Sequence, residues 1–274
     1  VVEQLESRPA DAILEEVYRK TAKSSEGNPS ELDRHWLEGP FTREELNEKF
    51  GSSLWVPAPR FGTDKQTDKK GNPKVRVIDD FSIMFHNACT TCFEKINVTG
   101  VDGIASTAKF WSDLVLMARR NRHWAFSTTL STGERLTGTL HKDFRENFQL
   151  VGQCLDLESA YRQLAVRPSQ KHLAVIGVLN TDTGKAEFFV MHDLPFGASS
   201  AVHHFNRASE ALEAVLQHSF GVPCTHYFDG FTFLLPEPLA RQVLGTVEKV
   251  FGLLGWSLKK EREDLSPTPE ALGV

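Results

Sequence analysis

Apolar positions in the first half of the chain fall into helical and strand-like stretches that are separated by polar turns. The spacing predicts a helix over residues 9–23. Residues 42–45 have the pattern of a capping box, and Gly51 follows as a stop signal, which predicts a short helix between them. Residues 54–61 and 74–78 are strand-like, and the polar loop between them predicts an antiparallel hairpin.

The pattern becomes sharper after this hairpin and alternates between hairpins and amphipathic helices. We expect a helix over 104–120, a hairpin over 130–140, a strand over 153–157, a helical turn or two over 158–164, a hairpin formed by 172–179 and 186–191, a helix over 200–218, a strand pair over 225–235 that turns at Asp229-Gly230, and a helix over 239–254. This order predicts an α+β fold in which helices cover an antiparallel sheet.

Composition places the chain among ordinary globular proteins and predicts an intracellular setting. Of the 274 residues, 40% are hydrophobic and 24% are charged, which suffices for a sizeable core. No apolar run approaches the roughly 18 residues of a membrane helix, so we expect no membrane partner. Four scattered cysteines indicate a reducing compartment rather than a disulfide scaffold. The chain starts with Val1 rather than Met, so we expect a fragment or a processed piece.

The net charge of −5 is unevenly distributed along the chain. Residues 1–50 contain 7 Lys/Arg and 12 Asp/Glu, whereas residues 60–122 contain 11 basic and 7 acidic residues. An acidic total mildly opposes nucleic-acid binding, and the local basic stretch leaves such binding possible.

Two aspartates follow apolar strands that should be neighbours in the sheet. Asp156 ends the stretch Cys-Leu-Asp, and Asp229 lies at the Tyr-Phe-Asp-Gly turn. Two converging carboxylates repel each other unless a divalent cation lies between them, and Mg²⁺ accepts one or two protein carboxylates. Such a pair supports phosphoryl transfer. On these two residues alone, a helix cap and a turn residue are the simpler interpretation.

Further motifs favour the metal-binding interpretation of Asp156 and Asp229, because their order and spacing resemble those of the conserved motifs in the reverse transcriptases of retroelements. Four motifs look like palm motifs A to D: Asp156-Leu-Glu-Ser-Ala-Tyr161, Leu194-Pro-Phe-Gly197, Tyr227-Phe-Asp-Gly230 and Leu254-Gly-Trp256. Residues 271–274 look like the start of motif E, and Pro59-Arg60-Phe61 with Lys74 to Phe81 resembles the fingers hairpin. The resemblance implies a right-hand polymerase fold with fingers and palm and without the thumb. The implied division is an acidic helical segment over 1–53, a fingers-like region over 54–150 and a palm over 151–274.

The resemblance also implies a role for each matching residue. Asp156 and Asp229 would be the catalytic, metal-binding carboxylates, with Mg²⁺ or Mn²⁺ as cofactor. Tyr161 would be the steric gate against a ribose 2′-OH, or else a core aromatic. The nucleotide-binding candidates are Arg76, which matches the triphosphate-gripping arginine, the weaker Arg60 and Lys74, and Phe196 and Gly197 of the nucleotide and template pocket. The possible proton donors in motif D are Lys259, Lys260 and Arg262.

One departure from the family pattern concerns motif C, where Gly230 replaces the second of two aspartates. The expected function is template-directed DNA synthesis from deoxynucleoside triphosphates on an RNA or DNA template with a primer, weakened by the missing carboxylate. The alternative is an inactive remnant that keeps the palm fold and binds nucleic acid or a protein partner. An RNA polymerase is disfavoured by the bulky Tyr161.

Overall fold

A computed structural model describes residues 1–7, 11–25, 27–67, 73–98, 100–121, 123–129, 132–146, 149–262 and 264–269. The predicted motif E over 271–274 lies outside the described residues. The chain forms two compact units, each of which is discontinuous in sequence. The first unit comprises Val1–Lys95 and Tyr161–Phe205, and the second comprises Ile96–Ala160 and Asn206–Val274. This division differs from the three consecutive segments that the sequence suggests.

The first unit is built on a five-stranded sheet with strand order β1-β8-β7-β2-β3. Its strands are β1 (Leu37–Phe41), β2 (Ala58–Thr67), β3 (Pro73–Asp79), β7 (Val175–Asn180) and β8 (Lys185–Met191). The β2–β3 and β7–β8 hairpins are antiparallel, as predicted, whereas β2 and β7 run parallel. All six residues of β7 are buried, which fits its central place in the sheet.

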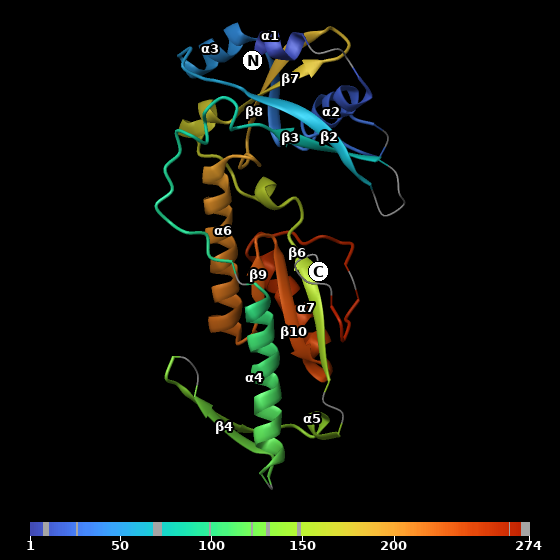
Figure 1. Ribbon diagram of the computed structural model, residues 1–274, viewed down its shortest axis with the longest axis vertical. Helices are drawn as coiled ribbons and strands as arrows, with labels where there is room; N and C mark the ends of the chain where they lie inside the picture. The colour runs from blue at the N-terminus through green and yellow to red at the C-terminus, as the bar shows by residue number, and fades with distance from the viewer. Residues whose placement is uncertain are drawn as a thin grey trace. The chain divides into compact units, whose positions relative to one another are not determined.

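Helices α1 (Val2–Glu6) and α2 (Ala12–Ala22) of the first unit pack on this sheet: α1 contacts β7 and β8, and α2 contacts β2, β3 and β7 (Figure 1). The first unit also contains α3 (Arg43–Phe50), the 3₁₀ turns η1 (Ala160–Gln163) and η2 (Pro168–Leu173), and the first part of α6 (Ser199–Ala214). Helix α2 begins at Ala12 because Asp11 caps it, with the Asp11 carboxylate accepting from the Leu14 N–H at 2.8 Å. Thr42 and Glu45 form the predicted capping box of α3, and Gly51 ends that helix in the left-handed conformation.

The second unit contains a three-stranded antiparallel sheet with strand order β6-β10-β9. Its elements are α4 (Val101–Arg119), β4 (Ala125–Thr129), β5 (Arg135–Thr139), α5 (Asp143–Glu146), β6 (Leu150–Asp156), the π-helical turn η3 (Val215–Ser219), β9 (Thr225–Tyr227), β10 (Gly230–Pro236) and α7 (Glu237–Leu253). Helix α7 packs on β6 and β10, and α4 packs on β10. The observed architecture is therefore α+β with helices on mainly antiparallel sheets, as the sequence predicts, except that β2 and β7 form a parallel pair.

The core of the second unit explains why β6 and β10 are paired in a fixed register. Leu155, Phe231 and Phe233 are fully buried, and the ring of Phe231 meets that of Phe251 from α7 at 5.1 Å. Because side chains alternate along a strand, Asp156 and Gly230 are assigned to the opposite, more exposed face. A one-residue slip would bury Asp156, so the apolar pattern fixes where this aspartate lies.

Among the described residues, no helix is both long and apolar enough to cross a membrane.

Candidate functional site

The structure brings Asp156 and Asp229 to the same end of the β6-β10-β9 sheet. Asp156 is the last residue of β6, and Asp229 lies in the two-residue turn between β9 and β10. The N–H of Leu157 donates to the carbonyl oxygen of Asp229 at 2.9 Å, which ties the two strand ends together. Burial raises the pKa of Asp229, and the nearby charge of Asp156 acts in the same direction.

Lys259 is the basic residue that reaches this carboxylate pair. Its ammonium group lies 2.8 Å from Oδ2 of Asp156, and its backbone N–H donates to the Asp156 carbonyl at 2.9 Å. Burial opposes the charge on Lys259, but the hydrogen bond and the charge of Asp156 outweigh it and raise the pKa of Lys259. The other two predicted donors lie elsewhere: Lys260 is exposed, and Arg262 pairs with Glu248.

Gly230 lies directly opposite Asp156 in the register of β6 and β10. A Cβ atom at Gly230 would lie 3.2 Å from Oδ1 of Asp156 and 3.4 Å from the sulfur of Cys154. A side chain at this position would therefore face Asp156 across the strands. Burial, followed by the charge of Asp156, raises the pKa of Cys154 to about 11, so this thiol stays protonated at neutral pH.

The turn itself differs from the sequence prediction by one residue. The two loop residues are Phe228 and Asp229, and Gly230 is already the first residue of β10, paired with Tyr227. The positive φ of 52° belongs to Phe228 and not to Gly230. A side chain at Gly230 therefore meets no positive-φ strain, and its main constraint is crowding against Asp156.

The donor set at this sheet end suits a hard cation but is small. It offers carboxylate oxygens from Asp156 and Asp229, and one oxygen of Asp156 is bonded to Lys259. No group of three or more His, Cys, Asp or Glu residues able to hold a metal occurs in the described part of the chain. Asp156 and Asp229 therefore fit Mg²⁺ only if water molecules and substrate phosphates supply most of the oxygen ligands of the cation.

The predicted nucleotide-binding residues of the first unit divide into exposed and buried ones. Arg76 and Lys74 are exposed on β3, and Arg76 lies opposite Thr63 of β2. Arg60, in contrast, has no exposed surface. Its guanidinium donates to both carboxylate oxygens of Asp79, at 2.6 and 2.9 Å. An arginine enclosed in this way cannot contact a triphosphate, so the assignment of Arg60 to nucleotide binding is corrected.

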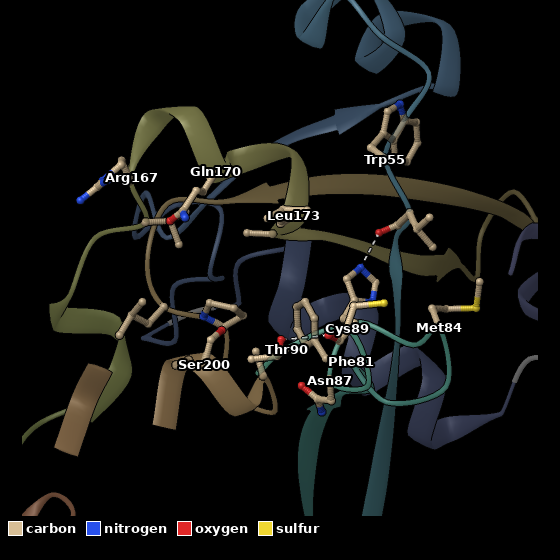
Figure 2. A pocket seen from close by; sticks show the side chains of 18 of the residues that line it. Trp55, Phe81, Met84, Asn87, Cys89, Thr90, Arg167, Gln170, Leu173 and Ser200 are labelled. Atoms are coloured by element: carbon tan, nitrogen blue, oxygen red, sulfur yellow. Dashed lines mark hydrogen bonds between the residues drawn. The ribbon is translucent and has the colours of Figure 1, made fainter. Parts of the chain in front are cut away.

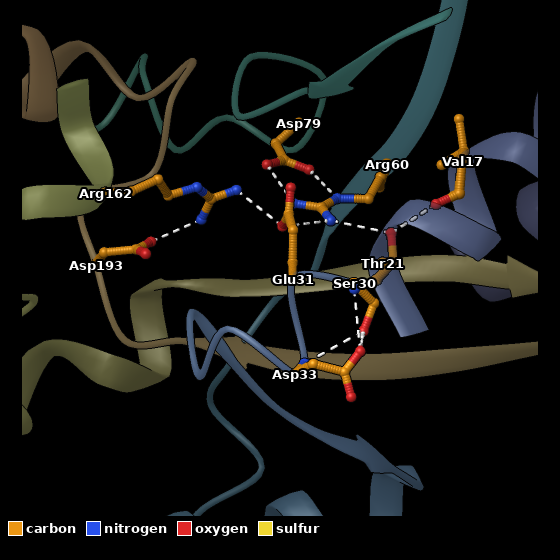
Figure 3. A network of polar contacts seen from close by, with 9 residues as sticks. All are labelled: Val17, Thr21, Ser30, Glu31, Asp33, Arg60, Asp79, Arg162 and Asp193. Atoms are coloured by element: carbon orange, nitrogen blue, oxygen red, sulfur yellow. Dashed lines mark hydrogen bonds and ion pairs between the residues drawn. The ribbon is translucent and has the colours of Figure 1, made fainter. Parts of the chain in front are cut away.

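Arg60 belongs instead to a buried polar network (Figure 3). Its Nη1 donates to Oε2 of Glu31 at 2.8 Å, and the Coulombic attraction of Asp79 and Glu31 outweighs the burial penalty and keeps Arg60 charged. Oε2 of Glu31 also accepts from Arg162 at 2.9 Å, and Arg162 donates to Asp193 at 2.6 Å. The local sequence pattern does not predict this network, although an arginine inside the apolar stretch 54–61 is a signal for a buried ion pair.

Tyr161 lies in η1 and is half-buried. Its ring stacks on that of Phe205 at 4.6 Å and meets the ring of Phe196 edge-on at 5.3 Å. Phe196 is 58% exposed, so this aromatic group extends from the core to the surface. The arrangement is compatible with both interpretations of Tyr161, the steric gate and the core aromatic.

Gly197 has a structural reason to be glycine. Its φ is +107°, and a Cβ atom at this position would come closer than 3.0 Å to the carbonyl oxygen of Asp79. This contact with the backbone at the end of β3 requires glycine at position 197, whereas the predicted role of Gly197 in a nucleotide pocket stays a prediction.

A cavity of about 690 Å³ lies within the first unit, and it combines aromatic and basic side chains (Figure 2). The buried Trp55 and Phe81 line it, as do the exposed Leu54, Phe85 and Leu173. The basic side chains that line it are Arg167, His86 and His204, and none of the described residues that line the cavity is acidic. A volume of this size accommodates a small ligand or one unit of a polymer.

Comparisons with known proteins give a likeness in fold. No protein-family model matches the sequence, and no curated protein is significantly similar to it. A mutant crystal structure of the protease-reverse transcriptase of prototype foamy virus aligns with 85% of the chain at 15% identity and a TM-score of 0.50. The native structure of that protein gives 14% identity, 85% coverage and a TM-score of 0.48. The chain spans 22% of the length of these proteins. At such identities the likeness concerns the fold alone, which resembles that of a reverse transcriptase fragment.

Proposed function

We propose that the chain contains the fingers and palm of a retroelement-type reverse transcriptase, which extends a primer along an RNA or DNA template with deoxynucleoside triphosphates. The observation that carries the proposal is the convergence of Asp156 and Asp229 at one end of the β6-β10-β9 sheet, with Lys259 bonded to Asp156. The reverse-transcriptase-like fold supports it.

The residues of the second unit would perform the chemistry. Asp156 and Asp229 would hold Mg²⁺ or Mn²⁺, and the bound cation would activate the attacking oxygen and stabilise the leaving one. Lys259 would donate a proton to the departing pyrophosphate, because its ammonium group lies at the carboxylate pair and is protonated at neutral pH.

The residues of the first unit would select and hold the nucleotide. Arg76 is exposed, has no ion-pair partner in the described part of the chain, and offers the planar fork that grips phosphate. The ring of Tyr161, fixed between Phe196 and Phe205, would discriminate against a ribose 2′-OH. Phe196 and Gly197 would shape the pocket around the base.

The cavity of the first unit supports a nucleic-acid partner. The exposed ring of Phe85 offers a face for stacking, and the guanidinium of Arg167 attracts phosphate. The absence of acidic side chains among its described lining residues fits a polyanionic ligand, although the chain as a whole is acidic.

A second candidate function, an inactive remnant that binds nucleic acid or a protein, is favoured by one observation. Gly230 faces Asp156, so the second aspartate of motif C, which Gly230 replaces, would have placed its carboxylate next to that of Asp156. The remaining Asp156 is already neutralised in part by Lys259.

Primer extension with Mg²⁺ or Mn²⁺ tests the proposal and separates the two candidates. Asp156→Asn should abolish extension, because the described part of the sheet end offers no other carboxylate than Asp229 to take its place. The matched control is Asp113→Asn, which breaks another exposed carboxylate–lysine pair, with Lys109 on α4, and should leave extension unchanged. Extension by Asp156→Asn at the parent rate contradicts the assignment. A folded parent that binds template-primer and does not extend it favours the remnant.

A further inference from the structure

Glu31 lies at the centre of the buried network of the first unit, in an N-terminal region to which the sequence assigns no role. Its Oε2 accepts hydrogen bonds from Arg60 at 2.8 Å and from Arg162 at 2.9 Å (Figure 3). The Glu31 side chain is 16% exposed, that of Arg162 is 12% exposed, and that of Arg60 is fully buried. These ion pairs are therefore largely shielded from water and are stronger than surface pairs.

Each of the two arginines also has a carboxylate of its own. Asp79 holds Arg60 with both oxygens, and Asp193 holds Arg162 at 2.6 Å. Among the described residues of this network, Glu31 is the only carboxylate that both arginines share. It therefore joins two ion pairs that would otherwise be separate.

The other members of the network lie next to the proposed nucleotide contacts of the first unit. Asp79 follows Arg76 by three residues in β3, and its carbonyl oxygen lies against Gly197. Arg162 directly follows Tyr161 in η1, and Asp193 precedes Phe196 by three residues. A shift of either arginine would thus displace a segment that carries one of these contacts.

We infer that Glu31 is a positioning residue, which fixes Arg60 relative to Arg162 and thereby sets the orientation of Tyr161 and Arg76 toward the nucleotide. The inference rests on the proposed function for its catalytic readout. It assigns a part in nucleotide selection to the N-terminal region, which contains none of the sequence motifs that resemble those of reverse transcriptases.

The charge balance of the network makes Glu31→Gln a suitable test. The parent network contains two arginines and three carboxylates, so the variant leaves two arginines and two aspartates. Each arginine keeps one ionic partner, and we expect the variant to fold. Glu31→Asp keeps the charge on a shorter side chain and is the second variant, which is used in the same assays should Glu31→Gln not fold. Glu16→Gln is the matched control, because Glu16 pairs with Arg19 on the neighbouring helix α2.

Steady-state primer extension gives the first readout. We expect Glu31→Gln to raise KM for the deoxynucleotide roughly tenfold with little change in kcat, and to reduce the preference for deoxynucleotides over ribonucleotides. A purely structural role would lower the amount of active protein and leave KM and the sugar preference unchanged. Unchanged KM and sugar preference in a folded Glu31→Gln variant would overturn the inference.

Hydrogen exchange gives a second readout that needs no catalysis. We expect faster exchange at residues 160–164 and 76–81 in Glu31→Gln, with no change in β6 and β10 of the second unit. This pattern supports the positioning role even if the parent does not extend primers, an outcome that would count against the proposed function alone. Unaltered exchange at 160–164 would overturn the role of Glu31 whatever the activity.

Discussion

Gly197→Ala tests the contact between the loop before α6 and the end of β3. The residue at 197 has a φ of +107°, and an added Cβ would meet the Asp79 carbonyl oxygen at a distance that real Cβ atoms essentially never show. A non-glycine residue in such a backbone conformation costs about 1–3 kcal/mol. Forcing the backbone of Asp79 away adds about 1–3 kcal/mol, the usual cost of overpacking. We therefore expect a loss of about 4 kcal/mol, a large part of the roughly 5–15 kcal/mol that stabilises a typical domain.

Two control glycines separate the contributions to this loss. Gly184 has a φ of +68° and open space around its Cβ, so Gly184→Ala measures conformational strain alone, about 1–2 kcal/mol. Gly245 lies inside α7, also with open space, so Gly245→Ala should stabilise the protein by about 0.5–1 kcal/mol.

Urea unfolding followed by circular dichroism measures all three free energies of unfolding. The expected order of stability is Gly245→Ala, parent, Gly184→Ala and then Gly197→Ala. If Gly197→Ala loses no more stability than Gly184→Ala, the close approach to Asp79 has no energetic weight, and the reasoning about this loop is refuted.

Four further predictions concern the sites described above. Gly230→Asp should lower the thermal unfolding midpoint in the absence of Mg²⁺, because the new carboxylate crowds Asp156. Added Mg²⁺ should raise both the midpoint and the rate of primer extension of this variant. An equal response of parent and variant to Mg²⁺ would contradict this prediction. Lys259→Gln should slow primer extension about 100-fold at saturating nucleotide, and an unchanged kcat would remove Lys259 from the reaction. Burial raises the pKa of Asp193 to about 6, so the Asp193 carboxyl binds a proton more tightly in the folded state than in the unfolded state. The contribution of Asp193 to the free energy of unfolding therefore falls as pH rises from about 4 to 6. The difference in unfolding free energy between parent and Asp193→Asn should therefore vary over this pH range and become constant above it. Tyr161→Ala should increase ribonucleotide incorporation in primer extension, and unchanged discrimination in a folded, active variant would identify Tyr161 as a core residue.

Local signals in the sequence predicted local structure well. The capping box at Thr42 and Glu45 and the stop at Gly51 depend on atoms within a few residues of one another, and they form as expected. The hairpins and the long helices likewise follow from periodicity that one short window contains. Strand β1 was not predicted, because its partner β8 is about 150 residues away and the two pair only in the folded protein.

Two residues show which properties the local sequence does not predict: the backbone conformation of Gly230 and the burial of Arg60. Asp-Gly is a strong turn signal, yet the register with β6 makes Gly230 a strand residue, and Phe228 takes the positive φ. The sequence predicts Arg60 to be a weak phosphate ligand, because basic residues are usually exposed. Its burial depends on Glu31 and Asp79, which are 29 and 19 residues away, and no local pattern indicates that they meet.

The path of the chain between the two units restricts how the protein can be divided. The polypeptide passes from one unit to the other after Lys95, Ala160 and Phe205, so residues 161–205 form an insertion within the sequence of the second unit. A continuous fragment over 151–274 would contain β7 and β8 without their neighbours β1 and β2, and would expose two unpaired strand edges that invite aggregation. A soluble second unit instead requires deletion of 161–205 and a short linker in their place. Directed evolution by segment exchange faces the same restriction, because any exchanged piece must begin and end within one unit.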